Sequence, residues 1–169
     1  YEKYLTYDNS KFSEALFYAY LSTGNEEYLT IAQESLNFLI SVCFQKDIFC
    51  PIGQRGWYSK EGRRAYFDQQ PLEAGSMVQA LAIAHSITKH EEYFTKAMKA
   101  FSWFLGRNMI NHALYNRVTG GCYDGLGETT ININQGAEST ISYLLARLTL
   151  EDISLHHSPQ ISLLKKSTE

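Results

Sequence analysis

The sequence predicts an all-α fold in which helical hairpins stack as part of an (α/α)6 toroid, with two long loops between the hairpins. The main observation is an internal repeat. Residues 25–40 (NEEYLTIAQESLNFLI) align without a gap to residues 90–105 (HEEYFTKAMKAFSWFL) at an offset of 65. Residues 70–74 (QPLEA) align to residues 135–139 (QGAES) at the same offset. Repeated hairpins bury a shared core only by stacking on one another, so the repeat predicts a ring-like array.

The same offset relates three carboxylates, Asp8, Glu73 and Glu138. Each lies where an inner helix of the array is expected to begin. Because the long loops precede two of these helices, we expect the three acids to share one rim of the ring. Capping is the simpler interpretation, since an acid at the third helical position often caps its own helix and interacts favourably with the helix dipole.

The first hairpin is predicted from periodicity and capping residues. Residues 10–22 have apolar side chains at the i, i+3, i+4 spacing of a helix, and Gly24 can end it. Asn25 can then cap a second helix that runs to about Cys43. Residues 45–69 break the pattern with one proline and three glycines, which predicts a long loop with short strands at DIFCPI (47–52) and RAYFD (64–68).

The next elements repeat this order. Pro71 suits a first helical turn, and the helix that follows to Thr88 is apolar on most sides, as expected for an inner helix. Residues 91–106 are more amphipathic and would form its outer partner. Residues 107–135 form the second long loop, and a third inner helix is expected from Gly136 to about Thr149.

Two segments follow from this assignment. Residues 1–150 would be a partial toroid, and residues 151–169 a polar C-terminal tail with one more short helix at 152–165. The N-terminus lacks an initiator methionine and a signal-like segment, which indicates a chain cut from a larger protein.

Composition excludes several classes of protein. The chain has 169 residues, 44% hydrophobic and 20% charged, which fits one globular domain with its own core. A net charge of −3 argues against nucleic-acid binding, and no apolar run is long enough to cross a membrane. Three cysteines without a CxxC pair favour a reducing, cytoplasmic location, and we expect no metal and no cofactor.

The first loop ends in a cluster of polar side chains, FDQQPLEA (67–74). Carboxylates and amides match the donors and acceptors of sugar hydroxyls. Aromatic rings upstream in the same loop can stack on the apolar faces of sugars. The alternative is a turn that caps the following helix. The candidate residues in this part of the chain are Asp68 and Glu73 for catalysis, and Asp8, Trp57, Tyr58, Gln69 and Gln70 for substrate binding.

The second loop ends in a denser polar stretch, TGGCYDGLGETTININQGAES (119–139). Turn chemistry alone explains its glycines and asparagines, but loops this long are often functional. Glycoside hydrolysis needs two carboxyl groups, and their separation decides between retention and inversion. The candidates here are Asp124 and Glu138 for catalysis, with Glu128 as another second carboxylate, and Tyr123, Asn134 and Gln135 for substrate binding.

Several motifs together carry a resemblance to a known family. They are LTYDN (5–9), PIGQRGWY (51–58), FDQQPLEA (67–74), FSWFLGRN (101–108), LYNRVTGGCYDGL (114–126) and NQGAESTISYLLARL (134–148). The chain resembles the helical C-terminal region of bacterial glycosyltransferase-like proteins, an (α/α) toroid of the six-hairpin glycosidase type. This resemblance implies a carbohydrate-active assembly whose transferase module and earlier hairpins lie outside this chain.

Three functions remain open. The chain could cleave or remodel a glycosidic bond, bind glycans without catalysis as a scaffold for a transferase, or serve only as a helical surface for protein contacts. The expected partners are an oligosaccharide, and either the missing N-terminal part of a larger chain or a second copy in a homodimer.

Overall fold

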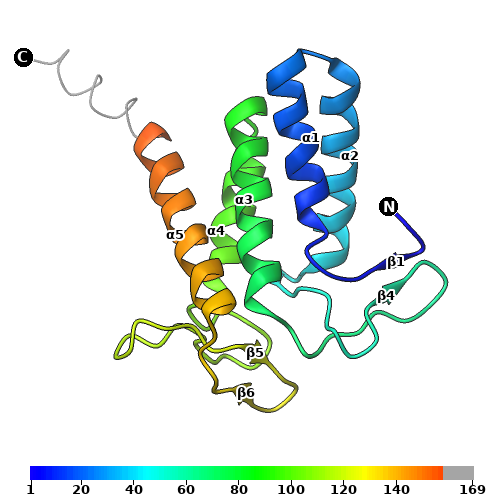
Figure 1. Ribbon diagram of the computed structural model, residues 1–169. Helices are drawn as coiled ribbons and strands as arrows, with labels where there is room; N and C mark the ends of the chain where they lie inside the picture. The colour runs from blue at the N-terminus through cyan, green and yellow to red at the C-terminus, as the bar shows by residue number, and fades with distance from the viewer. Residues whose placement is uncertain (158–169) are drawn as a thin grey trace, which may run out of the picture.

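A computed structural model describes residues 1–157. The described chain contains five helices and six strands of two residues each, with long loops between α2 and α3 and between α4 and α5 (Figure 1). The helices are α1 (Ser10–Thr23), α2 (Glu26–Cys43), α3 (Pro71–Thr88), α4 (Glu91–Ser102) and α5 (Ala137–His157). The strands are β1 (Tyr4–Leu5), β2 (Phe44–Gln45), β3 (Ile48–Phe49), β4 (Tyr58–Ser59), β5 (Gly125–Leu126) and β6 (Ile131–Asn132). The predicted all-α class is confirmed.

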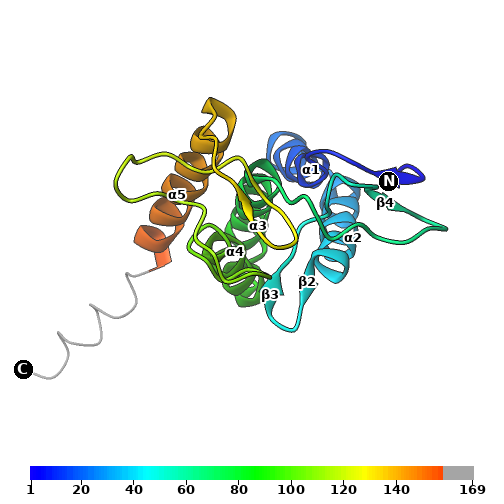
Figure 2. The ribbon, with the colours of Figure 1, turned by 90° about the horizontal axis from the view of Figure 1, so that it is seen from below.

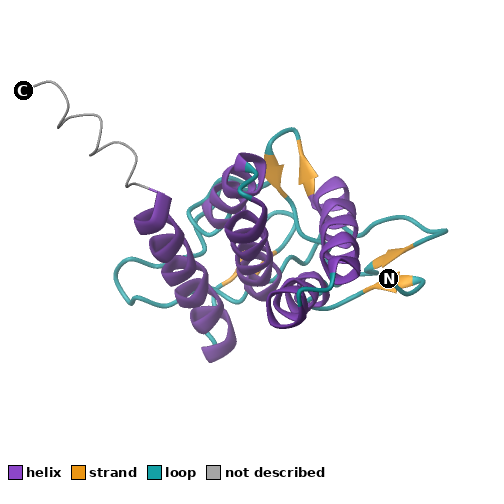
Figure 3. Ribbon diagram, turned by 90° about the horizontal axis from the view of Figure 1, so that it is seen from above, coloured by secondary structure: helices purple, strands orange, loops and turns teal. Residues whose placement is uncertain are grey.

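The helices form two layers. Helices α1, α3 and α5 lie side by side in one row, α2 packs on α1, and α4 packs on α3 (Figures 1 and 3). Thus α1–α2 and α3–α4 form two helical hairpins, and α5 extends the inner row. The inner helices begin at the same end of the molecule, where the long loops and the short strands also gather (Figures 1 and 2).

Local sequence explains the helix ends. Gly24 adopts a φ of 69° after α1 and donates its N–H to Tyr20 O, a geometry that suits a residue without Cβ. The Asn25 side chain caps α2 by accepting a hydrogen bond from the Glu27 N–H. Pro71 occupies the first turn of α3, where a missing N–H costs little.

The core lies between the two layers. Helix α3 is buried on nearly every side because α1, α4 and α5 all pack against it, as its apolar sequence predicted. The largest fully buried side chains include Phe17 from α1, Leu36 from α2 and Trp103 just after α4. Inner helices approach closely where side chains are small, as in the 2.8 Å contact between Ser10 Oγ and Ser76 Oγ.

Three predicted boundaries were wrong. α4 ends at Ser102, because the residues from Trp103 to Gly106 form turns. The predicted strand at 64–68 is absent; β4 forms earlier in that loop and pairs antiparallel with β1. α5 does not stop near Thr149 but continues unbroken to His157, because Leu150 and Ile153 extend its buried face. The remainder of the predicted helix at 152–165 lies outside the described residues.

Candidate functional site

The repeated carboxylates gather at the rim where the inner helices begin. The backbone N–H of Asp8 donates a 2.7 Å hydrogen bond to Oε1 of Glu73, across 65 positions of sequence. The Tyr7 hydroxyl donates a 2.8 Å hydrogen bond to Oε1 of Glu138. These two bonds connect the segment before α1 to the first turns of α3 and α5. The predicted common rim is therefore confirmed, while the roles of its acids stay predictions.

Glu73 is the buried member of this set, with 8% of its surface exposed. Burial raises the pKa of its carboxyl to about 7; the hydrogen bond from Asp8 opposes the rise, and the Asp8 charge adds to it. Its Oε1 accepts the hydrogen bond from the backbone N–H of Asp8, in the segment that leads into the neighbouring helix α1. Glu73 thus links two repeats, and its raised pKa lets it hold a proton near neutral pH.

An acidic cleft of about 640 Å³ lies beside this rim, between the two long loops. This volume is within the range of small-molecule sites. Two predicted catalytic residues, Asp68 and Asp124, come from opposite loops, and Glu138 comes from the first turn of α5. Glu128 and Gln70 also line it, whereas Glu73 lies outside its wall. The structure therefore brings three of the four predicted catalytic carboxylates together.

Asp68 and Asp124 are held by different contacts. Arg55 pairs with Asp68 through a 2.9 Å contact between Nε and Oδ2. Asp124 accepts hydrogen bonds from the Gly136 N–H and the Asn134 side-chain amide. Burial raises the pKa of Asp124, but hydrogen bonds from Ser139, Asn134 and Gly136 outweigh that effect, so its pKa is lowered. Asp124 is therefore a stable anion that also fixes the entry into α5.

Gln69 joins the two loops beneath the cleft. Its backbone exchanges 2.9 Å hydrogen bonds with Leu126 in both directions. Its fully buried amide accepts from the Trp103 indole N–H (2.7 Å) and donates to Tyr66 O (2.8 Å). The predicted sugar contact of Gln69 stays a prediction: the residue borders the cleft, but its side-chain donors and acceptor are engaged within the protein. Gln69 also holds Asp68 near the loop that carries Asp124.

The aromatic candidates do not form the wall of the cleft. Trp57 packs edge-on against Tyr7, with ring centroids 6.4 Å apart. Tyr58 pairs with Leu5 in the β1–β4 ladder and lines a separate hollow of about 280 Å³. The Tyr123 hydroxyl accepts a hydrogen bond from Asn116. None of these three residues lines the acidic cleft, and the sugar stacking expected of them stays a prediction.

Two further binding candidates have local partners. Asn134 donates to Asp124, and Gln135 accepts a 2.7 Å hydrogen bond from Thr119 Oγ1. Both side chains are exposed. They shape the second loop, and neither belongs to the cleft wall.

Sequence reasoning missed two residues at the site. Tyr7 was not among the sequence candidates, although its place next to Asp8 in LTYDN was an available signal. Arg55 was not a candidate either, yet it lines the cleft and pairs with Asp68. Its companion Arg64 is structural, with its guanidinium bonded to the carbonyls of Val42, Cys50 and Pro51.

The described residues also limit other chemistry. No group of three or more His, Cys, Asp or Glu side chains within residues 1–157 is placed to hold a metal ion. The three cysteines are free and buried. No helix in this part of the chain has both the length and the hydrophobicity to cross a membrane.

Comparisons with known proteins bear on the fold. No family model matches the sequence, and no curated protein matches it. Among solved structures, the glycoside hydrolase family 76 (mannosidase) protein Bt3792 from Bacteroides thetaiotaomicron superposes with a TM-score of 0.68 at 18% identity, over 89% of this chain and 40% of that one. The Lin0763 protein from Listeria innocua gives a TM-score of 0.54 at 15% identity, over 88% of this chain and 56% of that one.

The chain thus spans less than two thirds of the length of either structure. Sequence identities this low support a shared fold, but they do not show a shared activity. The inner row, the outer layer and the repeated hairpins agree with the superposition. The chain has the helical-hairpin architecture of an (α/α) toroid.

Proposed function

We propose that this chain is a carbohydrate-active domain of the glycosidase type, whose acidic cleft binds an oligosaccharide. The observation that carries the proposal is the cleft itself, where Asp68, Asp124, Glu128 and Glu138 meet from two loops and a helix start. Sugar hydroxyls donate hydrogen bonds, and carboxylates accept them. A cleft with several carboxylates at a helix rim suits glycosidic chemistry, which uses a pair of such groups.

The roles follow from the contacts. Asp124, with its lowered pKa, would act as the anionic partner that positions water or stabilises positive charge in the transition state. Asp68 or Glu138 would then supply the other carboxyl. Gln70 also lines the cleft, and its buried Oε1 has no hydrogen-bond partner among the described residues.

The choice of substrate to test first comes from the fold neighbour that is described as a mannosidase. Mannose-containing oligosaccharides are therefore the leading candidates, with glucose- and galactose-containing oligomers as comparisons. A glycosyltransferase context remains part of the proposal, because the motif resemblance points there.

The test measures binding and turnover in the same panel. Asp68→Asn, Asp124→Asn and Glu138→Gln keep the shape of each side chain and remove its charge. Calorimetric affinity for manno-oligosaccharides should fall for each variant, and product release should be lost where the residue is catalytic. Asp47→Asn is the matched control, because Asp47 pairs with Lys99 outside the cleft. Unchanged affinity and turnover in all three cleft variants would exclude the proposal.

A second candidate is a glycan-binding module without catalysis, which presents an acceptor to a transferase. It is favoured by the engagement of the two loop aspartates, since Asp68 is paired with Arg55 and Asp124 already accepts several hydrogen bonds. It predicts oligosaccharide binding without product formation. In either case we propose a reducing, cytoplasmic setting, consistent with three unpaired buried cysteines, and further hairpins from a longer chain or a second copy.

A further inference from the structure

A smaller hollow adjoins the acidic cleft on the side of the first long loop. It has a volume of about 480 Å³, and Tyr66, Phe67 and Met109 are among its lining residues. Arg55 and Glu128 line both this hollow and the cleft, so the two spaces meet at these residues. A ligand that fills the cleft can therefore continue past Arg55 and Glu128 without leaving the protein surface.

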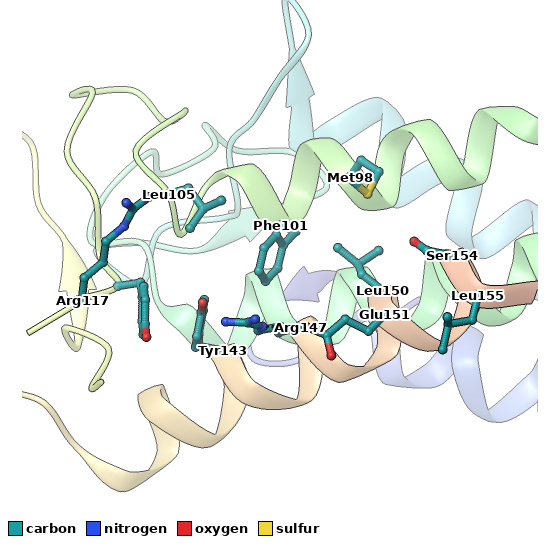
Figure 4. Close-up of a pocket in the computed structure, with 11 residues that line it drawn as sticks. Met98, Phe101, Leu105, Arg117, Tyr143, Arg147, Leu150, Glu151, Ser154 and Leu155 are labelled. Carbon is teal, nitrogen blue, oxygen red and sulfur yellow. Dashed lines mark hydrogen bonds and ion pairs between the residues drawn. The ribbon is translucent and has the colours of Figure 1, made fainter. Parts of the chain in front are cut away.

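Two other hollows do not continue the cleft. The larger, of about 920 Å³, lies between α4 and α5, and most of its lining is apolar, with Phe101 and Leu150 among the side chains (Figure 4). The smaller is the hollow beside Tyr58. None of the described residues that line either of them borders the acidic cleft. The space beside Tyr66 is thus the one that shares its boundary with the cleft.

The cleft and the adjoining hollow differ in chemistry. Among the described residues that line the cleft there are carboxylates and amides but no aromatic ring. The adjoining hollow has the rings of Tyr66 and Phe67 and the thioether of Met109. Tyr66 and Met109 are both 41% exposed, so their apolar surface is open to a ligand. A sugar has hydroxyls for the first surface and apolar C–H faces for the second.

The ring of Tyr66 is held in place by neighbouring residues. Its hydroxyl accepts a 3.2 Å hydrogen bond from Gln45 Nε2, and the Arg64 guanidinium lies over one face, 4.8 Å from the ring centroid. The backbone beside it is also fixed, because the Arg55 N–H donates a 3.1 Å hydrogen bond to Phe67 O. An ordered ring loses little conformational entropy when a ligand stacks on it. Since Arg64 occupies one face, a sugar would stack on the other.

Arg55 and Glu128 suit the passage between the two spaces. The bond from Arg55 Nε to Asp68 uses one of five guanidinium N–H donors, and the Arg55 side chain is 70% exposed. A hydroxyl at this point can accept a hydrogen bond from Arg55 and donate one to Glu128. The polar contacts of the cleft thus extend up to the aromatic hollow.

We propose that the hollow at Tyr66 is a second sugar subsite, continuous with the acidic cleft, in which one unit of an oligosaccharide stacks on the Tyr66 ring. The inference rests on the proposed function, because the same glycan must also occupy the cleft. It makes longer oligosaccharides, which reach both spaces across Arg55 and Glu128, the preferred ligands over disaccharides.

The test compares dimers and hexamers of manno-, gluco- and galacto-oligosaccharides by calorimetric titration into the full chain. In the series that binds, the hexamer should bind about tenfold more tightly than the dimer, because it also buries apolar surface on Tyr66. Tyr66→Ala should bring this ratio of affinities close to one. Tyr66→Phe keeps the ring and should keep the ratio.

Tyr18→Ala is the matched control, because Tyr18 is 52% exposed on α1, outside both spaces. It should keep the wild-type ratio. The methyl NMR signal of Met109, assigned with Met109→Leu, gives a second readout that needs no change at Tyr66. The hexamer should shift this signal, and the dimer should leave it nearly in place.

Two kinds of failure can be told apart. Equal affinities for dimer and hexamer, a ratio that survives Tyr66→Ala, or a Met109 signal that the hexamer does not move would overturn the subsite and leave the proposed function standing. Absence of binding by oligomers of every length and series would overturn both.

Discussion

The Asp8 N–H donates to the Glu73 carboxylate over 2.7 Å, so two positions related by the 65-residue repeat are joined directly. The carboxylate of Glu73, at the start of α3, accepts a hydrogen bond from the backbone that leads into α1. Two residues that the repeat relates in sequence are thus also in contact in the structure, and this contact holds the rim together. Burial raises the pKa of Glu73, so the rim that contains this contact is sensitive to pH.

Glu73→Gln should change how stability depends on pH. The folded pKa of Glu73 is about 7, above its value in the unfolded chain, so its contribution is present at acid pH and lost as pH rises through about 7. The wild type should lose about 3 kcal/mol of unfolding free energy from this group between pH 4.5 and 8. The substituted glutamine can still accept the Asp8 hydrogen bond without that loss, so the variant should be the more stable protein at pH 8.

Urea denaturation at pH 5 and at pH 8 measures this difference. Asp47→Asn is the control, because its exposed ion pair with Lys99 lies outside the rim. Equal pH dependence in the wild type and in Glu73→Gln would contradict the raised pKa.

Glu138→Gln should lower the pKa of Tyr7. Burial raises the pKa of Tyr7 to about 12, and the hydrogen bond and charge of Glu138 add to it. The glutamine keeps an acceptor but removes the negative charge that opposes phenolate formation. NMR of 13Cζ-labelled tyrosine, with Tyr7→Phe to assign the signal, follows this titration. An equal Tyr7 pKa in the wild type and in Glu138→Gln would contradict the hydrogen bond between Tyr7 and Glu138.

Periodicity made the helices and the rim predictable. The i, i+3, i+4 spacing marked α1 to α3, and Pro71 fixed the start of α3 within one residue. The offset of 65 placed Glu73 and Glu138 at equivalent helix starts without any structure. The continuation of α5 past Thr149 was also readable in principle, because Leu150 and Ile153 continue its apolar face, but the polar residues around them favoured a stop.

The cleft was only partly predictable because its walls depend on non-local contacts. Gln69 and Gln70 are adjacent, chemically identical and both border the cleft, yet only Gln69 is fully buried. What separates them is Trp103, which lies 34 positions away and supplies the indole donor. The partners of the aromatic loop residues were unpredictable for the same reason, since Tyr58 pairs with β1.

Gln69→Leu should destabilise the protein and disturb both sides of the cleft. The leucine leaves the buried Trp103 indole N–H without an acceptor and removes the donor to Tyr66 O. Such a loss costs about 1–3 kcal/mol for each unsatisfied group. Urea denaturation, monitored by tryptophan fluorescence, measures the loss of unfolding free energy. Gln54→Leu, at an exposed position on the same cleft, is the control and should stay within about 0.5 kcal/mol of the wild type.

Gly75→Ala should destabilise the protein, although alanine is normally the better helix former by about 1 kcal/mol. An added Cβ at Gly75 would lie 2.9 Å from the backbone oxygen of Ser142, so α3 and α5 would have to move apart. Overpacking of this kind costs about 1–3 kcal/mol. Thermal and urea unfolding should show the loss, and Ser86→Ala, at an exposed α3 position, should show little. An unchanged Gly75→Ala protein would mean that the inner helices do not touch at this point, and the close row that brings Glu138 to the rim would need another explanation.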